Sequence, residues 1–157
     1  MPKKNIIILI IVVLVVVSLF SLSKYLSPTK DLIAIWNAAG VECLPDGHAN
    51  LAQHIHQNIE VRVDGIPQAI PLTVGAATDC LAEVHMHEGE LGKIHVETTK
   101  ADHEFTLGQF FVVWGEPFDR EGFTSTVFVD GATSTEKANL LLKNKQDIQV
   151  LYVESTK

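Results

Sequence analysis

A long uncharged and mostly apolar run at the start of the chain limits what the rest of it can be. Residues 5–22, NIIILIIVVLVVVSLFSL, contain no charged side chain and consist almost entirely of Ile, Val and Leu. Since a helix rises about 1.5 Å per residue, the run can cross a hydrocarbon core of about 30 Å. Lys3 and Lys4 precede it, so the positive-inside rule leaves residues 1–4 in the cytoplasm. The sequence predicts a single-pass anchor over 5–22 in the cell membrane, with the rest extracytoplasmic.

A cleavable signal peptide is the alternative interpretation of this run. Its apolar region is usually only about 7–15 residues long and ends at an A-x-A-like site. Here only the stretch SLSK offers small residues for cleavage. We therefore expect a signal-anchor that is not cleaved, a polar tether over 23–30 and one domain over 31–157, which agrees with about 100–200 residues per domain.

The part of the chain after residue 30 is acidic. Four of the 12 Lys and Arg residues lie at or before residue 30, which leaves eight basic against all 19 acidic residues, a formal net charge of −11. Nucleic acids are bound through clustered Lys and Arg, so this balance argues against a nucleic-acid partner. It makes the domain attractive to cations, although solubility alone also explains many of the carboxylates.

Two cysteines, Cys43 and Cys80, lie in the domain. In an oxidising compartment an even pair favours a disulfide, which would stabilise the fold by roughly 2–4 kcal/mol. Thiolate ligation of a metal is the alternative. The sequence has no C-x-x-C, so neither a zinc ribbon nor a thioredoxin-like site is indicated.

The pattern of elements predicts an α+β, β-rich domain. DLIAIWNAAG reads as a helix with Asp31 in its first turn, and TLGQFFVVWG as a short helix that buries Leu107, Phe110, Phe111 and Trp114. The sequence around Asp64-Gly65 is a hairpin signal, which VFVDG repeats near the C-terminus. From Val84 onward the order is strand, strand, helix, strand, strand, which predicts a β-grasp-like sheet with one packed helix.

The stretch VHMHEGELGKIHVE is a second predicted hairpin, and its register decides where its histidines lie. A loop of three residues, Glu90-Leu91-Gly92, would place His87 directly across from His95, with His85 further along the same face. The apolar residues of both strands would share the opposite face. A loop of two or four residues would turn His95 onto that apolar face, so the apolar pattern independently supports the convergence of three imidazoles on the solvent face.

Converging imidazoles are the ligand pattern of Zn²⁺ and Cu²⁺ sites. A second H-x-H pair, in HIHQNIEVRV, points opposite to Ile55, Ile59 and Val61 and adds two candidates. Glu97 and Glu88 are expected to orient the ligands or to face the solvent rather than to bind the ion. His48 and His103 lie in a turn and in KADHE, where we expect ordinary surface residues. The candidate metal ligands are His85, His87, His95, His54 and His56.

The order of these motifs resembles a family of exported or membrane-anchored bacterial and archaeal domains whose function is uncharacterised. Its members typically read H-x-H…P…G…C…LHTHD…GxIHxE…LGxFFxxWG, and the resemblance covers about residues 43–150. It implies the same five histidines as the site and Cys43 with Cys80 as the pair. The chain departs at HMHEGELG, where Met86 and Glu88 replace the usual Thr and Asp.

Together these features predict a membrane-anchored, extracytoplasmic domain that binds or delivers a copper or zinc ion rather than catalysing a reaction. A metal-free, membrane-tethered interaction module with an unidentified protein partner is the first alternative. A small metallohydrolase, with Glu97 as general base, is the second. The sequence contains neither H-E-x-x-H nor a Ser-His-Asp signature for such an enzyme.

Overall fold

The computed structural model describes residues 28–45 and 47–155. The predicted cytoplasmic N-terminus, the anchor over 5–22 and most of the tether lie outside the described residues. Within the described ranges, no helix is both long and apolar enough to cross a membrane. Residues 33–157 form one compact unit, which holds every histidine of the chain.

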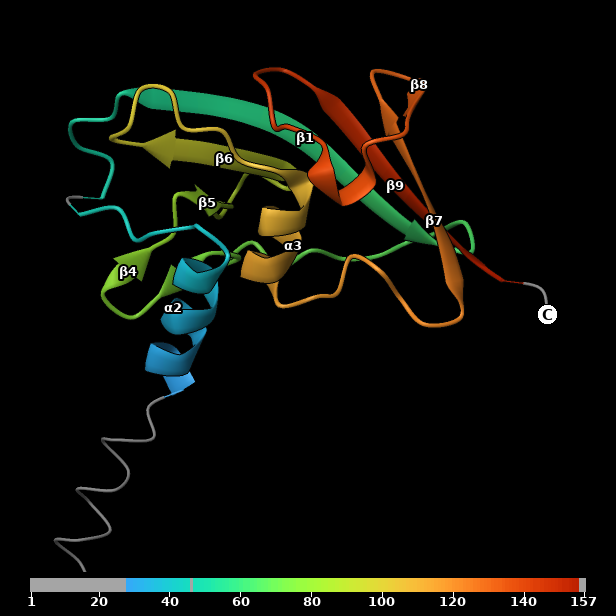
Figure 1. The fold of residues 1–157 in the computed structure, drawn as a ribbon, viewed down its shortest axis with the longest axis horizontal. Helices are drawn as coiled ribbons and strands as arrows, with labels where there is room; N and C mark the ends of the chain where they lie inside the picture. Colours follow the sequence, from blue (N-terminus) through green and yellow to red (C-terminus); the bar gives the residue numbers. More distant parts are fainter. Residues whose placement is uncertain (1–27, 46, 156–157) are drawn as a thin grey trace, which may run out of the picture. The chain divides into compact units, whose positions relative to one another are not determined.

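A mixed sheet is the centre of this unit (Figure 1). Its strands follow the order β5-β6-β1-β9-β7-β8, and the short strand β2 pairs with the end of β1. A separate two-stranded ladder joins β3 to β4. The strands are β1 (Gln53–Val63), β2 (Ile66–Pro67), β3 (Ala76–Ala77), β4 (Cys80–Leu81), β5 (Val84–His85), β6 (Lys93–Thr98), β7 (Phe123–Val129), β8 (Ala132–Ser134) and β9 (Asp147–Glu154).

The expected α+β, β-rich class is confirmed, but the place of β1 differs from the expectation. The five elements from Val84 onward do not form the sheet by themselves, because β1 lies between β6 and β9. It pairs antiparallel with β6 and parallel with β9. Strand order depends on which apolar faces meet in space, and the local sequence pattern does not contain that information.

Both Asp-Gly hairpins are confirmed. Asp64 and Gly65 have φ of 48° and 81° between β1 and β2, and Asp130 and Gly131 have φ of 52° and 81° between β7 and β8. Two consecutive positive φ values are what a two-residue turn of type I′ requires, and Asp-Gly provides them at low cost. The return strands are much shorter than the sequence pattern indicated, with two residues in β2 and three in β8.

Helix α3 (Leu107–Trp114) covers the apolar face of the sheet (Figure 1). The Thr106 side chain accepts from the Gln109 backbone and the Gln109 side chain accepts from the Thr106 backbone, a capping box that begins the helix. Gly115, with φ of 83°, ends it. Three of the four expected core residues are buried, whereas Trp114 is half-buried against Phe110 and Phe111.

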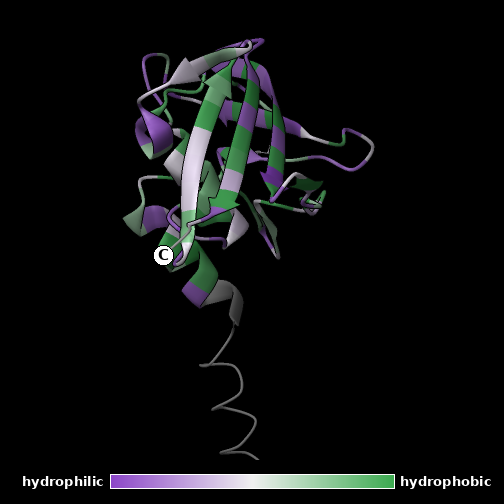
Figure 2. Ribbon diagram, turned by 90° about the vertical axis from the view of Figure 1, so that its right-hand side faces the viewer, coloured by the Kyte–Doolittle hydropathy of each residue, from purple (hydrophilic) through white to green (hydrophobic). Residues whose placement is uncertain are grey.

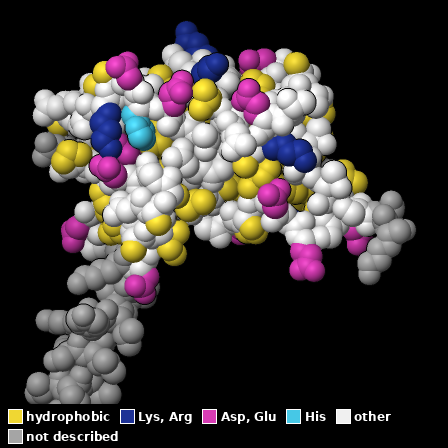
Figure 3. Space-filling model, viewed as in Figure 1, with side chains coloured by type: hydrophobic (Ala, Val, Ile, Leu, Met, Phe, Trp, Pro, Cys, Tyr) yellow, Lys and Arg dark blue, Asp and Glu magenta, His cyan; other side chains and the backbone are white. Residues whose placement is uncertain are grey.

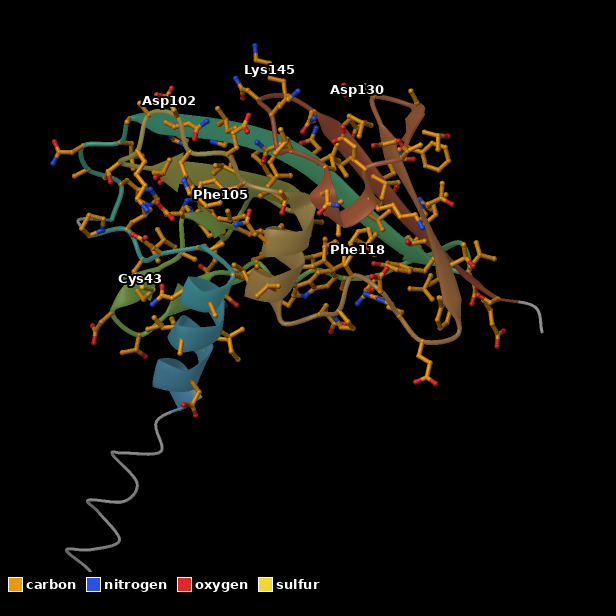
Figure 4. The ribbon with its side chains drawn as sticks, viewed as in Figure 1. Cys43, Asp102, Phe105, Phe118, Asp130 and Lys145 are labelled. Atoms are coloured by element: carbon orange, nitrogen blue, oxygen red, sulfur yellow. A yellow bond between two sulfur atoms is a disulfide. The ribbon has the colours of Figure 1, made fainter. Side chains whose placement is uncertain are left out.

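Along the strands, apolar and polar residues alternate (Figure 2), so the sheet has two unlike faces. The face beneath α3 is built from apolar side chains, and Phe105 and Phe118 lie on either side of the helix (Figure 4). The opposite face of β1, β5 and β6 carries the histidines. The fully buried residues of the apolar face include Val61, Val84, Ile94, Val96, Val127, Ile148 and Val150.

A disulfide joins Cys43 to Cys80, as the sequence predicted, with 5.3 Å between the two Cα atoms. Helix α2 (Pro28–Ala38) precedes Cys43, and Cys80 begins β4. Both cysteines of the chain are therefore oxidised, which rules out thiolate ligation. The closed loop is also expected to stabilise the fold by roughly 2–4 kcal/mol.

Candidate metal centre

Cross-strand pairing brings four site residues onto one face. His56 of β1 lies opposite His95 of β6, and His54 lies opposite Glu97 one pair along. Directly opposed side chains have Cβ atoms about 4.5–5.5 Å apart. On the other side of β6, His85 of β5 lies opposite His95. His95 is therefore flanked by a histidine from each neighbouring strand.

The register of the β5–β6 hairpin differs from the prediction by two residues. His85, not His87, is the partner of His95, and seven residues rather than three connect the two strands. Just beyond the end of β5, the Met86 amide donates to the Val74 carbonyl. A shift of two preserves the side-chain alternation. His85, His87 and His95 consequently still lie together on one face, although the predicted register was wrong.

The histidine face is only partly open to solvent, which corrects a second expectation. His85 is fully buried and His95 is only 4% exposed. On the side drawn in Figure 3, histidine reaches the surface of the described chain at one place only. The cover includes the loop between Leu44 and β1, because His48 on that loop contacts the cluster.

His48 is a member of the cluster that the sequence did not indicate. Its ring lies 5.0 Å from the ring of His87 and 5.9 Å from that of His85, centroid to centroid. Its Nδ1 is 2.6 Å from Glu97 Oε2. His48 is an isolated histidine in the turn CLPDGHAN, about 40 residues before its partners, and no local periodicity marks it. The expectation of an ordinary surface residue was wrong for His48.

Buried polar contacts hold the segment before this loop against the hairpin. Cys43 bridges to Ala82, and the Leu44 amide donates to the Leu81 carbonyl. The buried carboxylate of Glu83 accepts from the Thr98 hydroxyl at 2.6 Å and from the Glu42 amide at 3.0 Å. Together with the disulfide, these contacts determine where the loop that carries His48 starts.

The side chains form two groups whose donor atoms could each hold a metal ion. The atoms of each group lie within 4.8 Å of one another. Group A combines the β5 hairpin with the loop before β1, and group B combines the β1 pair with β6. Group A consists of His48, His85, His87 and Glu97, and group B consists of His54, His56 and His95. Each of the five predicted ligands thus belongs either to group A or to group B. His103 lies apart from both, beside Phe105.

In both buried histidines, one ring nitrogen is already bound to a protein oxygen. His85 Nδ1 donates to the Ala82 carbonyl at 2.7 Å, which leaves its Nε2 as an acceptor, 3.0 Å from His87 Nε2. His95 Nε2 contacts Glu90 Oε2 at 2.5 Å, which leaves Nδ1 facing the cluster. Metal-binding histidines are commonly oriented in this way by a carbonyl or carboxylate on the other nitrogen.

Glu90 therefore has the orienting role that was one of the two expectations for Glu88. Its second oxygen accepts from Lys93 Nζ at 2.7 Å, and these contacts lower the pKa of Glu90 to about 2. Glu88 is exposed and has no hydrogen bond within the described residues. The longer loop explains the exchange, because its turns bring position 90 back toward His95.

Glu97 is the buried carboxylate at the middle of the cluster, with its side chain 1% exposed. Its Oε2 meets His48 Nδ1 at 2.6 Å, and its Oε1 meets His54 Nε2 at 3.0 Å. Burial alone would raise the pKa of Glu97, but the hydrogen bond from His48 and the nearby histidines outweigh it and lower that pKa. The position supports the expectation that Glu97 is part of the centre.

Burial keeps the inner histidines neutral, and neutral imidazole is the form that coordinates metals. Desolvation lowers the pKa of His85 to about 4, against the opposing effect of its hydrogen bond to Ala82. Desolvation also lowers the pKa of His95 and His56, and His54 adds to the effect on His56. These residues are thus ready to bind a cation at neutral pH.

Comparison with protein-family models, with curated proteins and with solved structures found no match. The resemblance to exported histidine-motif domains stays a prediction.

Proposed function

We propose that this protein is a membrane-anchored, extracytoplasmic domain that binds Zn²⁺ or Cu²⁺ through its histidine cluster and holds the ion for delivery. The observation that carries the proposal is the pair His85 Nε2 and His87 Nε2, 3.0 Å apart, with His85 Nδ1 anchored on Ala82. Two imidazole nitrogens directed at each other from one hairpin, with His48 and Glu97 beside them, match the ligand set of such ions.

The donor types favour Zn²⁺ and Cu²⁺ over Cu⁺. Cu⁺ prefers thiolate and thioether ligands, and the two cysteines are joined in the disulfide. The thioether of Met86 belongs to a buried side chain that alternates with His85 and His87 along the chain, so it points to the apolar side. Imidazole and carboxylate are therefore the groups that the described cluster offers.

Delivery, rather than catalysis, is supported by the engagement of Glu97. A general base needs an unoccupied oxygen near its substrate. Both oxygens of Glu97 contact histidines, and the two described hollows, of about 320 and 420 Å³, are lined by no histidine. The side chains of His48 and His54 are 53% and 47% exposed, which leaves the cluster accessible for exchange of an ion.

The anchor, the extracytoplasmic location, the β-grasp-like description of the sheet and the family resemblance belong to the same proposal. The disulfide supports the location, because such bonds persist in oxidising compartments. The acidic balance of the domain supports a cationic cargo.

A metal-binding measurement on the full chain in mild detergent tests the proposal. After chelator treatment, the protein is titrated with Zn²⁺, Cu²⁺ and Cu⁺. We expect tight binding of Zn²⁺ or Cu²⁺, and at least tenfold weaker binding by His87→Gln, since one lost ligand of three or four costs about 1.4 kcal/mol or more.

His103→Gln is the matched control, because it removes a histidine outside both groups. It should bind like the unaltered protein. Binding that is no tighter than that of a His85→Gln, His87→Gln double variant would reject the metal proposal. The metal-free interaction module would then be the better account of the cluster.

A further inference from the structure

We propose that the cluster is a two-ion centre in which the carboxylate of Glu97 bridges one ion in group A and a second ion in group B. The inference rests on the proposed function and goes beyond it, because that function needs only one ion. It assigns His54, His56 and His95 to a site of their own, and it assigns one oxygen of Glu97 to each ion.

The contacts of Glu97 divide between the two groups. Oε2 contacts His48, which belongs to group A, at 2.6 Å. Oε1 contacts His54 at 3.0 Å and lies 3.7 Å from Nδ1 of His95, both of which belong to group B. A carboxylate whose two oxygens contact two separate sets of nitrogen donors has the arrangement of a bridging ligand in two-metal sites.

The contact between His95 and Glu97 is the second observation. Nε2 of His95 is bound to Glu90, so Nδ1 of the neutral ring presents an electron pair. That nitrogen is buried and has no hydrogen-bond partner in the described residues, yet it faces the oxygen of a carboxylate. Two electron-rich atoms at this separation repel one another unless a cation lies between them.

The spacing of these two atoms fits one ion. Nitrogen and oxygen ligands lie about 2.0–2.2 Å from Zn²⁺, so two of them are about 3.4–3.8 Å apart at bond angles of about 110–120°. The observed 3.7 Å between His95 Nδ1 and Glu97 Oε1 falls in this range. The ring of His56 lies 4.3 Å from the ring of His95, and the ring of His54 lies 4.6 Å from that of His56, so further nitrogens are close by.

The two groups are also neighbours in space. The His87 and His95 rings, one from each group, have centroids 4.4 Å apart, and the His85 and His95 rings stack at 5.5 Å. Two-metal sites hold their ions about 3.5–4 Å apart. Adjacent groups that share one carboxylate provide the framework for such a pair.

The test counts ions and measures their proximity in the full chain. The metal-free protein is equilibrated with Cu²⁺ and, separately, with Zn²⁺, and the bound metal is measured by mass spectrometry after dialysis. We expect two ions per chain. The form with two Cu²⁺ should also give the half-field line of closely spaced ions in its electron paramagnetic resonance spectrum.

His56→Gln is the informative variant, because His56 is half-exposed on β1 and the fold does not depend on its burial. It should bind one ion and lose the half-field line, while His103→Gln should keep both properties. Glu97→Gln should lose the half-field line as well. One ion per chain in the unaltered protein, or two ions without that line, would overturn the bridged centre and leave the proposed function intact. No bound ion would overturn both.

Discussion

His85 lies directly opposite His95 across the β5–β6 pair, and the two rings stack with 5.5 Å between centroids and 19° between planes. Both side chains are buried, and each fixes one nitrogen on a protein oxygen. These two histidines therefore belong to the packed interior as well as to the proposed centre. Their substitution will change stability and binding together, whereas substitution of the exposed histidines will change binding alone.

His95→Gln should lower the free energy of unfolding of the metal-free protein by about 1–3 kcal/mol, because it leaves buried polar groups without their partners. His54→Gln, at a side chain that is 47% exposed, should change it by less than about 0.5 kcal/mol. Both should weaken metal binding at least tenfold. Urea denaturation and metal titration measure the two effects, and equal losses of stability would contradict the difference in burial.

Gly75→Ala should disturb the centre from outside it. A Cβ at Gly75 would lie 2.6 Å from the Cβ of His85, too close for both to stay in place. Gly65→Ala is the matched control, because Gly65 has a similar φ of 81° but no atom near its Cβ position. Both variants should lose stability from backbone strain. Only Gly75→Ala should also weaken metal binding, and equal affinities in the two variants would show that His85 tolerates the displacement.

The metal-free protein should lose stability as the pH falls from about 6.5 to about 4. The unfolded chain binds a proton at His85 near pH 6.5, while burial lowers the pKa of the folded His85 to about 4. Between these values the unfolded state holds more protons, so the free energy of unfolding rises with pH. Below pH 4.5 the loss should continue, because Glu90 has its pKa lowered to about 2 in the folded protein.

Denaturant titrations of the chelator-treated protein at several pH values will measure this dependence. His85→Gln should flatten the slope between pH 4 and 6.5, since the group that titrates differently in the two states is gone. A slope that is unchanged in this variant would assign the pH dependence to other residues.

Reduction of the Cys43–Cys80 disulfide should weaken metal binding as well as the fold. The stability lost should be about 2–4 kcal/mol. Since the disulfide fixes the start of the loop that carries His48, the reduced protein should also bind metal less tightly. In His48→Gln this second effect of reduction should be much smaller. Thiol alkylation of the unreduced, denatured protein should label neither cysteine.

The parts of the fold that depend on local chemistry could be predicted from the sequence. Asp64-Gly65 and Asp130-Gly131 form the expected turns because each pair tolerates two positive φ values. Helix α3 begins after Thr106, whose side chain caps it, and ends at Gly115, whose backbone adopts a positive φ. The alternation of VHMH and KIHVE placed the histidines on the correct face, because parity survives a shift of two residues.

Features that depend on distant segments could not be predicted. Strand β5 ends at His85, next to a Met86 amide that donates to the Val74 carbonyl, and the connection to β6 is longer than predicted, with a different partner for His95. His48 joins the cluster through the disulfide and the contacts of Glu83, none of which leave a pattern around residue 48. The same loop explains why Glu90, and not Glu88, contacts His95.

The central position of β9 has a consequence for the order in which this protein matures. Residues 147–154 are the last of the described strands in the sequence, yet they lie between β1 and β7, with a parallel partner about 90 residues away in sequence. Pairings of such long range form slowly. The pairing of β1 with β9 cannot form until β9 has left the ribosome. The strand that carries His54 and His56 can pair with β6 before that, but its other edge stays unpaired until β9 is available.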